Sequence, residues 1–227
     1  MKFLTVLAKW VFILCLPPLL LTASIAGAVN SNWLYEYGFE KYNVSQTTGL
    51  SESELEKAAG GLIGYFNSDE EYISVTVTKD GKPFQLFNER EVGHLKDVKE
   101  LFRLDYWVML GAFIYASGYS TIYLFWRKER RPLAQGLAGG SILTLALTLV
   151  LGLGALFSFD QLFLQFHLIS FANDLWLLDP TRDYLIMLFP GGFWYDTTLF
   201  CALATVVGAM VTGGVSVGYL ITYKTRP

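Results

Sequence analysis

The two histidines of this 227-residue chain, His94 and His167, are the residues most suited to proton chemistry. Each lies in a segment rich in charged or aromatic residues, just outside an apolar stretch. Histidine is the side chain whose ordinary pKa lets it take up and release protons near neutral pH. Two histidines on one membrane face therefore predict general acid and base chemistry on a substrate carried by the lipid bilayer.

The composition is that of a membrane protein. Apolar residues make up 53% of the chain and aromatic residues 16%, and the apolar residues come in long blocks. Because a helix needs about 20 such residues to cross a bilayer, transmembrane helices are predicted at residues 4–29, 106–126, 133–157 and 197–222. The predicted fold class is an α-helical membrane protein with four transmembrane helices and a small mixed α/β extracytoplasmic cap.

The chain divides into three predicted regions: a first transmembrane helix at 4–29, the cap at 30–104, and a three-helix transmembrane region at 105–227 that includes an interfacial aromatic segment at 158–196. The charged start, the apolar run and Ala26-Gly27-Ala28 also resemble a signal peptide. Since the apolar run is longer than in a usual signal peptide, we expect a retained helix.

The distribution of positive charge predicts the orientation, because Lys and Arg beside short loops resist translocation. The two ends of the chain and the loop at 127–131 carry a single acid, Glu129, so both termini are predicted to be cytoplasmic and the cap extracytoplasmic. The net charge is −3, and when the charges are assigned to the two membrane faces, neither face carries a basic patch of the kind that binds nucleic acid. The basic residues concerned are Lys2, Lys9, Arg127, Lys128, Arg130, Arg131, Lys224 and Arg226.

Local signals predict the elements of the cap. Ser51 and Glu54 have the spacing of a capping box, with Leu50 and Leu55 as a hydrophobic staple, which predicts a helix over 52–66. Residues 72–78 alternate in polarity and are rich in β-branched side chains. They are followed by Lys79-Asp80-Gly81-Lys82 and a second strand at 83–87, which predicts a hairpin.

The first histidine lies on a predicted helix that Asn88 and Glu91 open and that continues into the second transmembrane span. Helical spacing puts Arg90, His94 and Asp97 on one face. Gly93 inside the helix suggests that another group approaches closely. A solvated charged face is the alternative interpretation of this segment.

The second histidine lies among aromatic residues. If the segment is helical, His167, Phe171 and Asp174 share a face, as expected for a helix lying in the membrane interface. Asp179 followed by proline predicts a further helix that runs to about Phe189. The alternative here is an aromatic belt with a lone histidine at its edge.

Other chemistries have weaker support. There is no metal-binding motif or cysteine cluster, although the two histidines with Asp97 or Asp174 could form a metal site. No serine lies in a nucleophile-elbow motif. Cys15 and Cys201 fall inside predicted spans, so no disulfide is expected. Acid and base catalysis without a covalent intermediate or a cofactor fits best, and metal-dependent membrane hydrolysis stays an alternative.

Several motifs together resemble a bacterial integral membrane protein family, the lipoprotein intramolecular transacylases. The resemblance covers the whole chain, although the Gly-Gly-Phe-Trp-Tyr-Asp stretch after Pro190 is a looser version of the family's aromatic ending. The matching motifs are Phe87-Asn88-Glu89-Arg90-Glu91 with His94, Asp97-Val98-Lys99, Phe166-His167, Asn173-Asp174 with Trp176, Leu178-Asp179-Pro180 and Phe189-Pro190.

The resemblance implies transfer of an acyl chain from the sn-2 glyceryl ester of a diacylated lipoprotein to the α-amine of its N-terminal cysteine, which gives the lyso-form. The catalytic pair would be His94 and His167, with the roles of base and acid left open. The implied residues that bind or orient the substrate are Arg90, Glu91, Asp97, Lys99, Phe166, Phe171, Asn173, Asp174, Trp176 and Asp179.

The resemblance also implies a protein of the bacterial plasma membrane, with the lipoprotein and the lipid bilayer as partners. We expect a monomer, although the glycines that allow tight helix packing do not fix the oligomeric state. Among the implied roles, Arg90 or Lys99 would hold the substrate backbone or the oxyanion, and the aromatic side chains would confine the acyl chains. The alternative from another class is a non-enzymatic membrane protein whose outer cap binds a partner, with the histidines as interface or pH-sensing groups.

Overall fold

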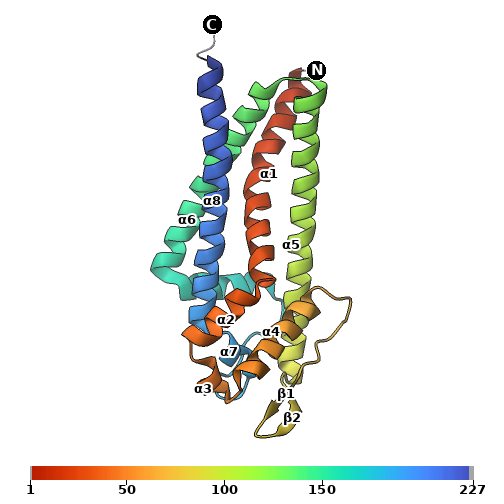
Figure 1. Cartoon of the computed structure of the whole chain (residues 1–227), viewed down its shortest axis with the longest axis vertical. Coiled ribbons are helices and arrows are strands. Elements are labelled where there is room, and N and C mark those ends of the chain that lie inside the picture. Colours follow the sequence, from red (N-terminus) through yellow and green to blue (C-terminus); the bar gives the residue numbers. More distant parts are fainter. Residues whose placement is uncertain (1, 225–227) are drawn as a thin grey trace. The chain divides into compact units, whose positions relative to one another are not determined.

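The computed structural model describes residues 2–224, and its regular elements are helices apart from one hairpin (Figure 1). Side chains are described for residues 3–222, so the charged group of Arg226 and the side chains of Lys2 and Lys224, used above for the orientation, lie outside the described residues. The elements are α1 (Lys2–Val29), α2 (Asn32–Lys41), α3 (Val44–Thr48), α4 (Glu52–Phe66), β1 (Thr76–Lys79), β2 (Lys82–Gln85), α5 (Glu89–Thr121), the π-helix η1 (Ile122–Trp126), α6 (Arg130–Ser170), α7 (Tyr184–Leu188) and α8 (Gly191–Lys224).

Four helices, α1, α5, α6 and α8, are long and apolar enough to cross a membrane, as the sequence predicts. Two of them extend beyond their apolar stretch. Helix α5 is continuous from its charged start at Glu89 into the apolar part that begins near residue 106. Helix α6 is interrupted at Ser158, where φ is −154° and ψ is 54°, so the expected span at 133–157 ends at this break.

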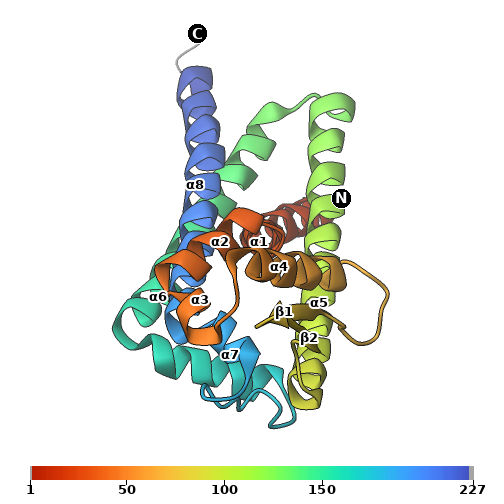
Figure 2. The same cartoon turned by 60° about the horizontal axis from the view of Figure 1, so that its bottom comes forward.

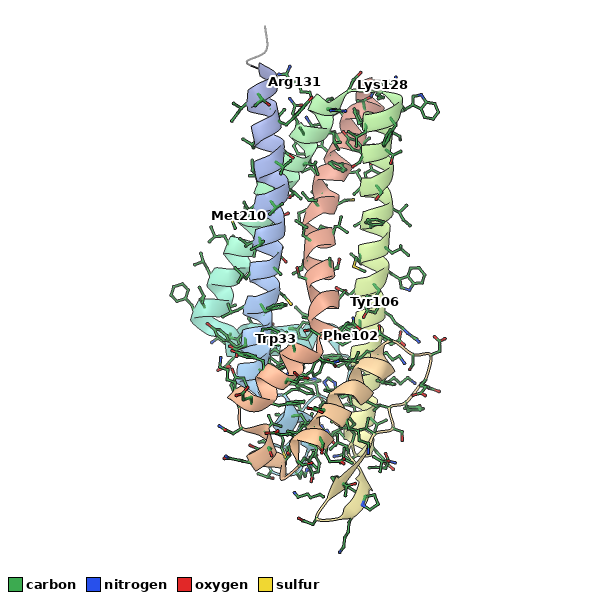
Figure 3. All side chains as sticks on the ribbon, in the orientation of Figure 1. Trp33, Phe102, Tyr106, Lys128, Arg131 and Met210 are labelled. Carbon is green, nitrogen blue, oxygen red and sulfur yellow. The ribbon has the colours of Figure 1, made fainter. Side chains whose placement is uncertain are left out.

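The chain forms two compact units. The first contains residues 2–26, 105–156 and 199–224, and small residues allow its helices to approach closely. A Cβ atom on Gly136 would lie 2.7 Å from Phe12, and one on Gly140 would lie 2.8 Å from Leu16. Figure 3 shows Lys128 and Arg131 at one end of these helices.

The second unit contains residues 27–104 and 157–198 and has its own apolar core. Short helices and the hairpin of this unit are visible in Figure 2. The hairpin is antiparallel with Val77 opposite Phe84, and Asp80 and Gly81 both have positive φ, 53° and 74°, as a two-residue turn requires. Its first strand begins at Thr76, later than the predicted residue 72, because the partner strand ends at Gln85, opposite Thr76.

One predicted cap and one predicted helix start are wrong. Helix α4 begins as predicted, but the Ser51 side chain makes no capping bond; its hydroxyl lies 3.0 Å from the Ser53 hydroxyl, and the Glu54 carboxylate accepts the backbone N–H of Thr78. Residues 179–183 form a turn, and α7 is limited to Tyr184–Leu188. The Asp179 carboxylate accepts bonds from Thr181, which closes a local turn.

Candidate functional site

The second unit brings the two histidines together. His94 comes from the charged start of α5 and His167 from α6 beyond the break at Ser158. Their ring centroids are 6.2 Å apart with 29° between the ring planes. Both side chains are almost completely buried, with exposed fractions of 7% and 9%. Two rings at this distance can act on neighbouring atoms of one small group.

His167 has a fixed orientation. Its Nδ1 lies 2.8 Å from the carbonyl oxygen of Phe163, one helical turn earlier. In the neutral ring Nδ1 donates to this carbonyl, which leaves Nε2 as the basic nitrogen. Phe163 and Trp176 enclose the ring, with centroids 4.4 and 5.0 Å away. His167 is therefore held as a base whose second nitrogen is free for a substrate.

His94 is buried in a different way. Its Nδ1 has no hydrogen-bond partner, and Phe171 packs edge-on against the ring at a centroid distance of 4.9 Å. Burial lowers its pKa from 6.5 to about 4; the nearby His167 adds to this shift, and Asp97 opposes it. His94 precedes the apolar part of α5, and at neutral pH its ring is uncharged.

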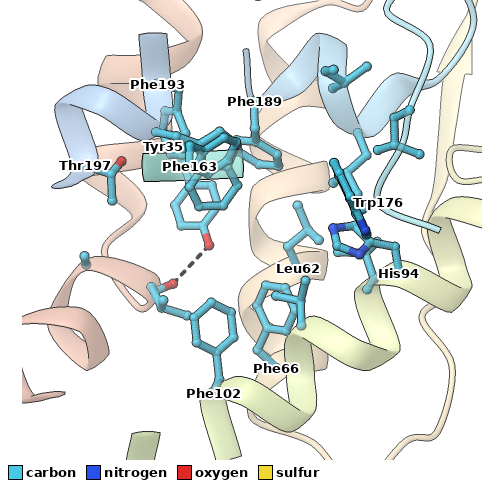
Figure 4. A pocket seen from close by; sticks show the side chains of 18 of the residues that line it. Tyr35, Leu62, Phe66, His94, Phe102, Phe163, Trp176, Phe189, Phe193 and Thr197 are labelled. Atoms are coloured by element: carbon cyan, nitrogen blue, oxygen red, sulfur yellow. Dashed lines mark hydrogen bonds between the residues drawn. The ribbon is translucent and has the colours of Figure 1, made fainter. Parts of the chain in front are cut away.

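The histidines line a cavity of about 220 Å³. Its walls are largely aromatic and aliphatic, and Figure 4 shows Tyr35, Leu62, Phe102, Phe163 and Phe189 around it, with His94 beside Trp176. Tyr35 donates its hydroxyl to the backbone carbonyl of Val29. No carboxylate, lysine or arginine is among the described residues that line this cavity. Such a cavity suits a lipid chain whose reactive group reaches the imidazoles.

The predicted face of α5 holds the chain segment that follows α6. Arg90 donates through Nη2 to the backbone carbonyl of Asp174, and the Asn173 side chain donates to Asp97 Oδ2 at 2.9 Å. Between them, a Cβ atom on Gly93 would lie 2.9 Å from Leu175 Cδ1. The close approach that the glycine predicts is therefore present. This face therefore contacts protein, with Arg90 and Asp97 only partly buried.

Two of the expected orienting residues lie elsewhere. The Glu91 carboxylate is 1% exposed and accepts the backbone N–H groups of Asn88 and Leu185 at 2.8 and 2.6 Å. Burial raises its pKa, and these hydrogen bonds oppose the shift. Lys99 donates to the backbone carbonyl of Glu70 at 2.6 Å and lies over the Tyr65 ring. Both side chains therefore fix the second unit without lining the cavity.

The other expected residues fall into two groups. Phe171 and Trp176 contact the histidine rings, as described above. Phe166 contacts His167 edge-on at 5.3 Å but is 46% exposed and lies outside the cavity. Asp179 is also outside it, in the turn with Thr181. Hydrogen bonds from Thr181 lower the pKa of Asp179, although burial opposes them.

Sequence reasoning missed most of the cavity wall. Tyr35 in α2 packs edge-on against Phe189 at 5.6 Å and lies 6.3 Å from Phe193. A Cβ atom on Gly38 would lie 2.4 Å from the Phe193 ring. The one available signal was Gly38 between aromatic residues, and no local spacing connects residue 35 with residue 189.

The metal alternative can be compared with the geometry. Within residues 2–224, no three His, Cys, Asp or Glu side chains are grouped so that they could hold a metal ion. Asp97 is engaged by Asn173, and Asp174 contributes its backbone carbonyl to Arg90. Neither carboxylate joins the two imidazoles as a third ligand.

Comparison with known proteins gives both a family and a fold. The sequence model of the family described as lipoprotein intramolecular transacylase Lit matches residues 10–194. The solved structure of the membrane-integral Lit from Bacillus cereus is similar to this chain with a TM-score of 0.83, 22% identity and 99% of each chain covered. A form of that protein with one histidine replaced by alanine has a TM-score of 0.79 and 21% identity, with 98% of this chain and 96% of that one covered. An uncharacterized protein from Aquifex aeolicus is 27% identical over 172 residues, 74% of either chain.

Proposed function

This chain belongs to the lipoprotein intramolecular transacylase family, and we propose that its substrate is a diacylated lipoprotein. The acyl chain at the sn-2 glyceryl ester moves to the α-amine of the same molecule's N-terminal cysteine. The product is a lyso-form lipoprotein with an N-acyl group. As a member of this family the chain is an acyltransferase, and four apolar helices make it a multi-pass membrane protein.

The observation that carries this proposal is the pair of imidazoles in an otherwise apolar cavity. The reaction needs an uncharged amine, a polarised ester and protection from water. It does not need an enzyme nucleophile, because the amine and the ester are tethered in one molecule. The walls around His94 and His167 supply a place for an acyl chain, and the rings supply proton transfer.

We assign the base to His167 and the acid role to His94. The Nδ1–H of His167 donates to the Phe163 carbonyl, which stabilises the ring when Nε2 takes the proton of the ammonium group. His94, with its lowered pKa, is a poor base but a suitable N–H donor to the ester oxygen. An uncharged imidazole can polarise a carbonyl in this way.

The step balances as follows. The ammonium group loses one proton to His167, and the free amine attacks the ester carbon, which forms a C–N bond and a tetrahedral oxyanion. The C–O bond to glycerol then breaks, and the glyceryl oxygen takes one proton through a histidine. The nitrogen loses its second proton as the amide forms, so the net release is one proton.

We further propose the orientation that positive charge predicts: both termini cytoplasmic and the cap with the histidines extracytoplasmic, in a bacterial plasma membrane. The basic residues Lys128 and Arg131 at one end of the first unit support it. Because one chain supplies all the cavity walls described here, we expect a monomer to be active. Neither a cofactor nor a metal has a role in this mechanism.

The test is fragmentation mass spectrometry of a diacylated lipoprotein co-expressed with this protein. Transfer leaves the total mass unchanged, so the N-terminal fragment must be read for an amide-linked acyl chain. We expect that amide with the wild type and not with His94→Ala or His167→Ala. A free N-terminus with the wild type, or full conversion by either variant, would falsify the proposal.

A further inference from the structure

A short irregular segment covers the histidine pair. This segment, residues 171–178, is called the strap here; it begins where α6 ends at Ser170 and has no helix or strand of its own. Residues 172–174 are exposed. The inner side of the strap carries two rings: Phe171 packs against His94 at 4.9 Å, and Trp176 lies 5.0 Å from His167. The strap is therefore one wall between the imidazoles and solvent.

Few polar contacts hold the strap to α5. Arg90 donates to the Asp174 carbonyl, and Asp97 accepts from the Asn173 amide. The Asn173 side chain also accepts the backbone N–H of Leu175 at 3.0 Å, which fixes the local turn. Leu175 in turn rests against Gly93, where a Cβ atom would lie 2.9 Å from Leu175 Cδ1. The strap is therefore attached to α5 by these two side-chain contacts and by the packing of Leu175.

The residues of α5 that hold the strap lie outside the cavity lining. Neither Arg90 nor Asp97 lines the cavity, and Arg90 has a buried Nε without an acceptor. The guanidinium group therefore binds the strap through a single described N–H donation. A fully paired arginine would hold the strap more tightly than this arrangement does.

We propose that Arg90 and Asp97 are positioning residues that keep the strap closed over His94 and His167, so that water is excluded while the acyl chain moves from ester to amine. The proposal rests on the proposed function and adds a device for fidelity. The competing reaction is hydrolysis, in which water attacks the same ester carbon, the C–O bond to glycerol breaks, and the products are a fatty-acid carboxylate, an alcohol and one proton. Excluding water is a recognised way to suppress such side reactions.

The chain has only two histidines, so histidine labelling reports on His94 and His167 alone. The full chain is labelled with ¹³C at histidine and titrated by NMR in lipid nanodiscs, so that His94 and His167 give two signals. The variants are Arg90→Gln and the uncharged change Asn173→Ala. Arg103→Gln is the matched control, because it removes the same charge from the same helix, where Arg103 pairs with Glu100.

Loosening the strap should hydrate His94. Its titration midpoint should then rise towards its ordinary value by on the order of one pH unit, because a hydrated ring is protonated more easily than a buried one. The charged and titratable groups that act on this ring are His167 from α6 and Asp97 from α5, and both remain in these variants. The control should leave the midpoint unchanged.

The second readout is the partition between transfer and hydrolysis by the same variants on a diacylated lipoprotein. Arg90→Gln and Asn173→Ala should release more free fatty acid per N-acyl product, whereas Arg103→Gln should match the wild type. Arg90→Lys, which keeps a donor for the Asp174 carbonyl, should restore part of the ratio. If Arg90 and Asn173 had only a structural role, their variants would lower total activity and leave the ratio of free fatty acid to N-acyl product unchanged.

Two results would overturn the inference. One is an unchanged His94 midpoint in both strap variants; the other is an unchanged ratio of hydrolysis to transfer. In either case a wild type that forms the N-acyl product would leave the proposed function intact. A wild type that forms no N-acyl product would overturn the proposed function, and the strap proposal with it.

Discussion

The two units of this molecule differ in where their unpaired buried polar groups lie. In the first unit, the hydroxyls of Thr144, Thr205 and Thr212 donate to the carbonyl four residues earlier in their own helices. Asp105 Oδ2 and the Tyr119 hydroxyl are buried there without partners, and neither residue lines the cavity. In the second unit, His94 Nδ1, Arg90 Nε and the Thr197 hydroxyl are buried without partners. Locally satisfied groups serve helix packing in a membrane, whereas the unpaired His94 and Thr197 line the cavity, where a substrate is expected to supply their partners.

The largest expected effect is the loss of proton transfer in the second unit. His94→Ala and His167→Ala should each lower the rate of N-acylation by about 10²–10⁴-fold, the usual contribution of a positioned acid or base. The first unit should be unaffected, so thermal unfolding in detergent should stay close to that of the wild type. Initial rates by mass spectrometry measure the effect. A histidine variant with near-normal rates would remove the distinction between the units.

The next effect concerns the buried carboxylate of the second unit. Glu91→Ala leaves the N–H groups of Asn88 and Leu185 without acceptors, which should lower the free energy of unfolding by on the order of 3 kcal/mol. The Leu185 amide should also exchange its hydrogen faster in Glu91→Ala than in the wild type. Glu91→Gln keeps one acceptor oxygen, so its free energy of unfolding should fall less. Equal exchange in all three proteins would mean that this carboxylate does not hold α7.

A smaller effect is expected in the first unit, where packing decides stability. Gly140→Ala places a Cβ atom 2.8 Å from Leu16 and 3.1 Å from the backbone oxygen of Ile13, and such overpacking should cost about 1–3 kcal/mol. Gly152→Ala in the same helix meets nothing within 4 Å and is the matched control. Thermal unfolding distinguishes them. Equal stability of the two variants would contradict the close helix contact.

The smallest effect should come from a hydroxyl that is satisfied within its own helix. Thr144→Val removes the 2.8 Å donation to the Gly140 carbonyl, but that carbonyl keeps its backbone partner in the helix. The loss of stability should be below about 1 kcal/mol, with unchanged N-acylation. Unfolding and activity assays of one preparation provide both numbers. A marked loss of activity would show that the first unit is more than a scaffold.

Local sequence signals predicted helices and strands more reliably than they predicted which residues contact each other. The four apolar stretches needed only composition and length, and the helix at 52–66 needed only the signals at its first residues. Asn88 caps α5 as predicted, with Glu91 returning a bond to the Asn88 N–H. The equivalent prediction for Ser51 and Glu54 was wrong, because Glu54 has a distant partner in Thr78. A capping signature does not reveal a competing donor 24 residues away.

The site was predictable only in part for the same reason. The two histidine segments and the helical face at Arg90 and Asp97 follow from residue type and spacing. That this face would hold the strap, and that Tyr35 would meet Phe189, depends on tertiary contacts between segments far apart in the sequence. The aromatic density of 158–196 indicated an interface, but the same residues also form a cavity wall.

The most direct test of the central claim is a crossover experiment with the purified protein in nanodiscs. Two diacylated lipopeptides are mixed, one with a deuterated sn-2 acyl chain and the other with an isotopically heavy peptide. If transfer is intramolecular at the histidine pair, each N-acyl product keeps the acyl chain of its own peptide, and His94→Ala and His167→Ala give almost none. Products that combine the deuterated chain with the heavy peptide, or release of fatty acid without any amide, would contradict the account.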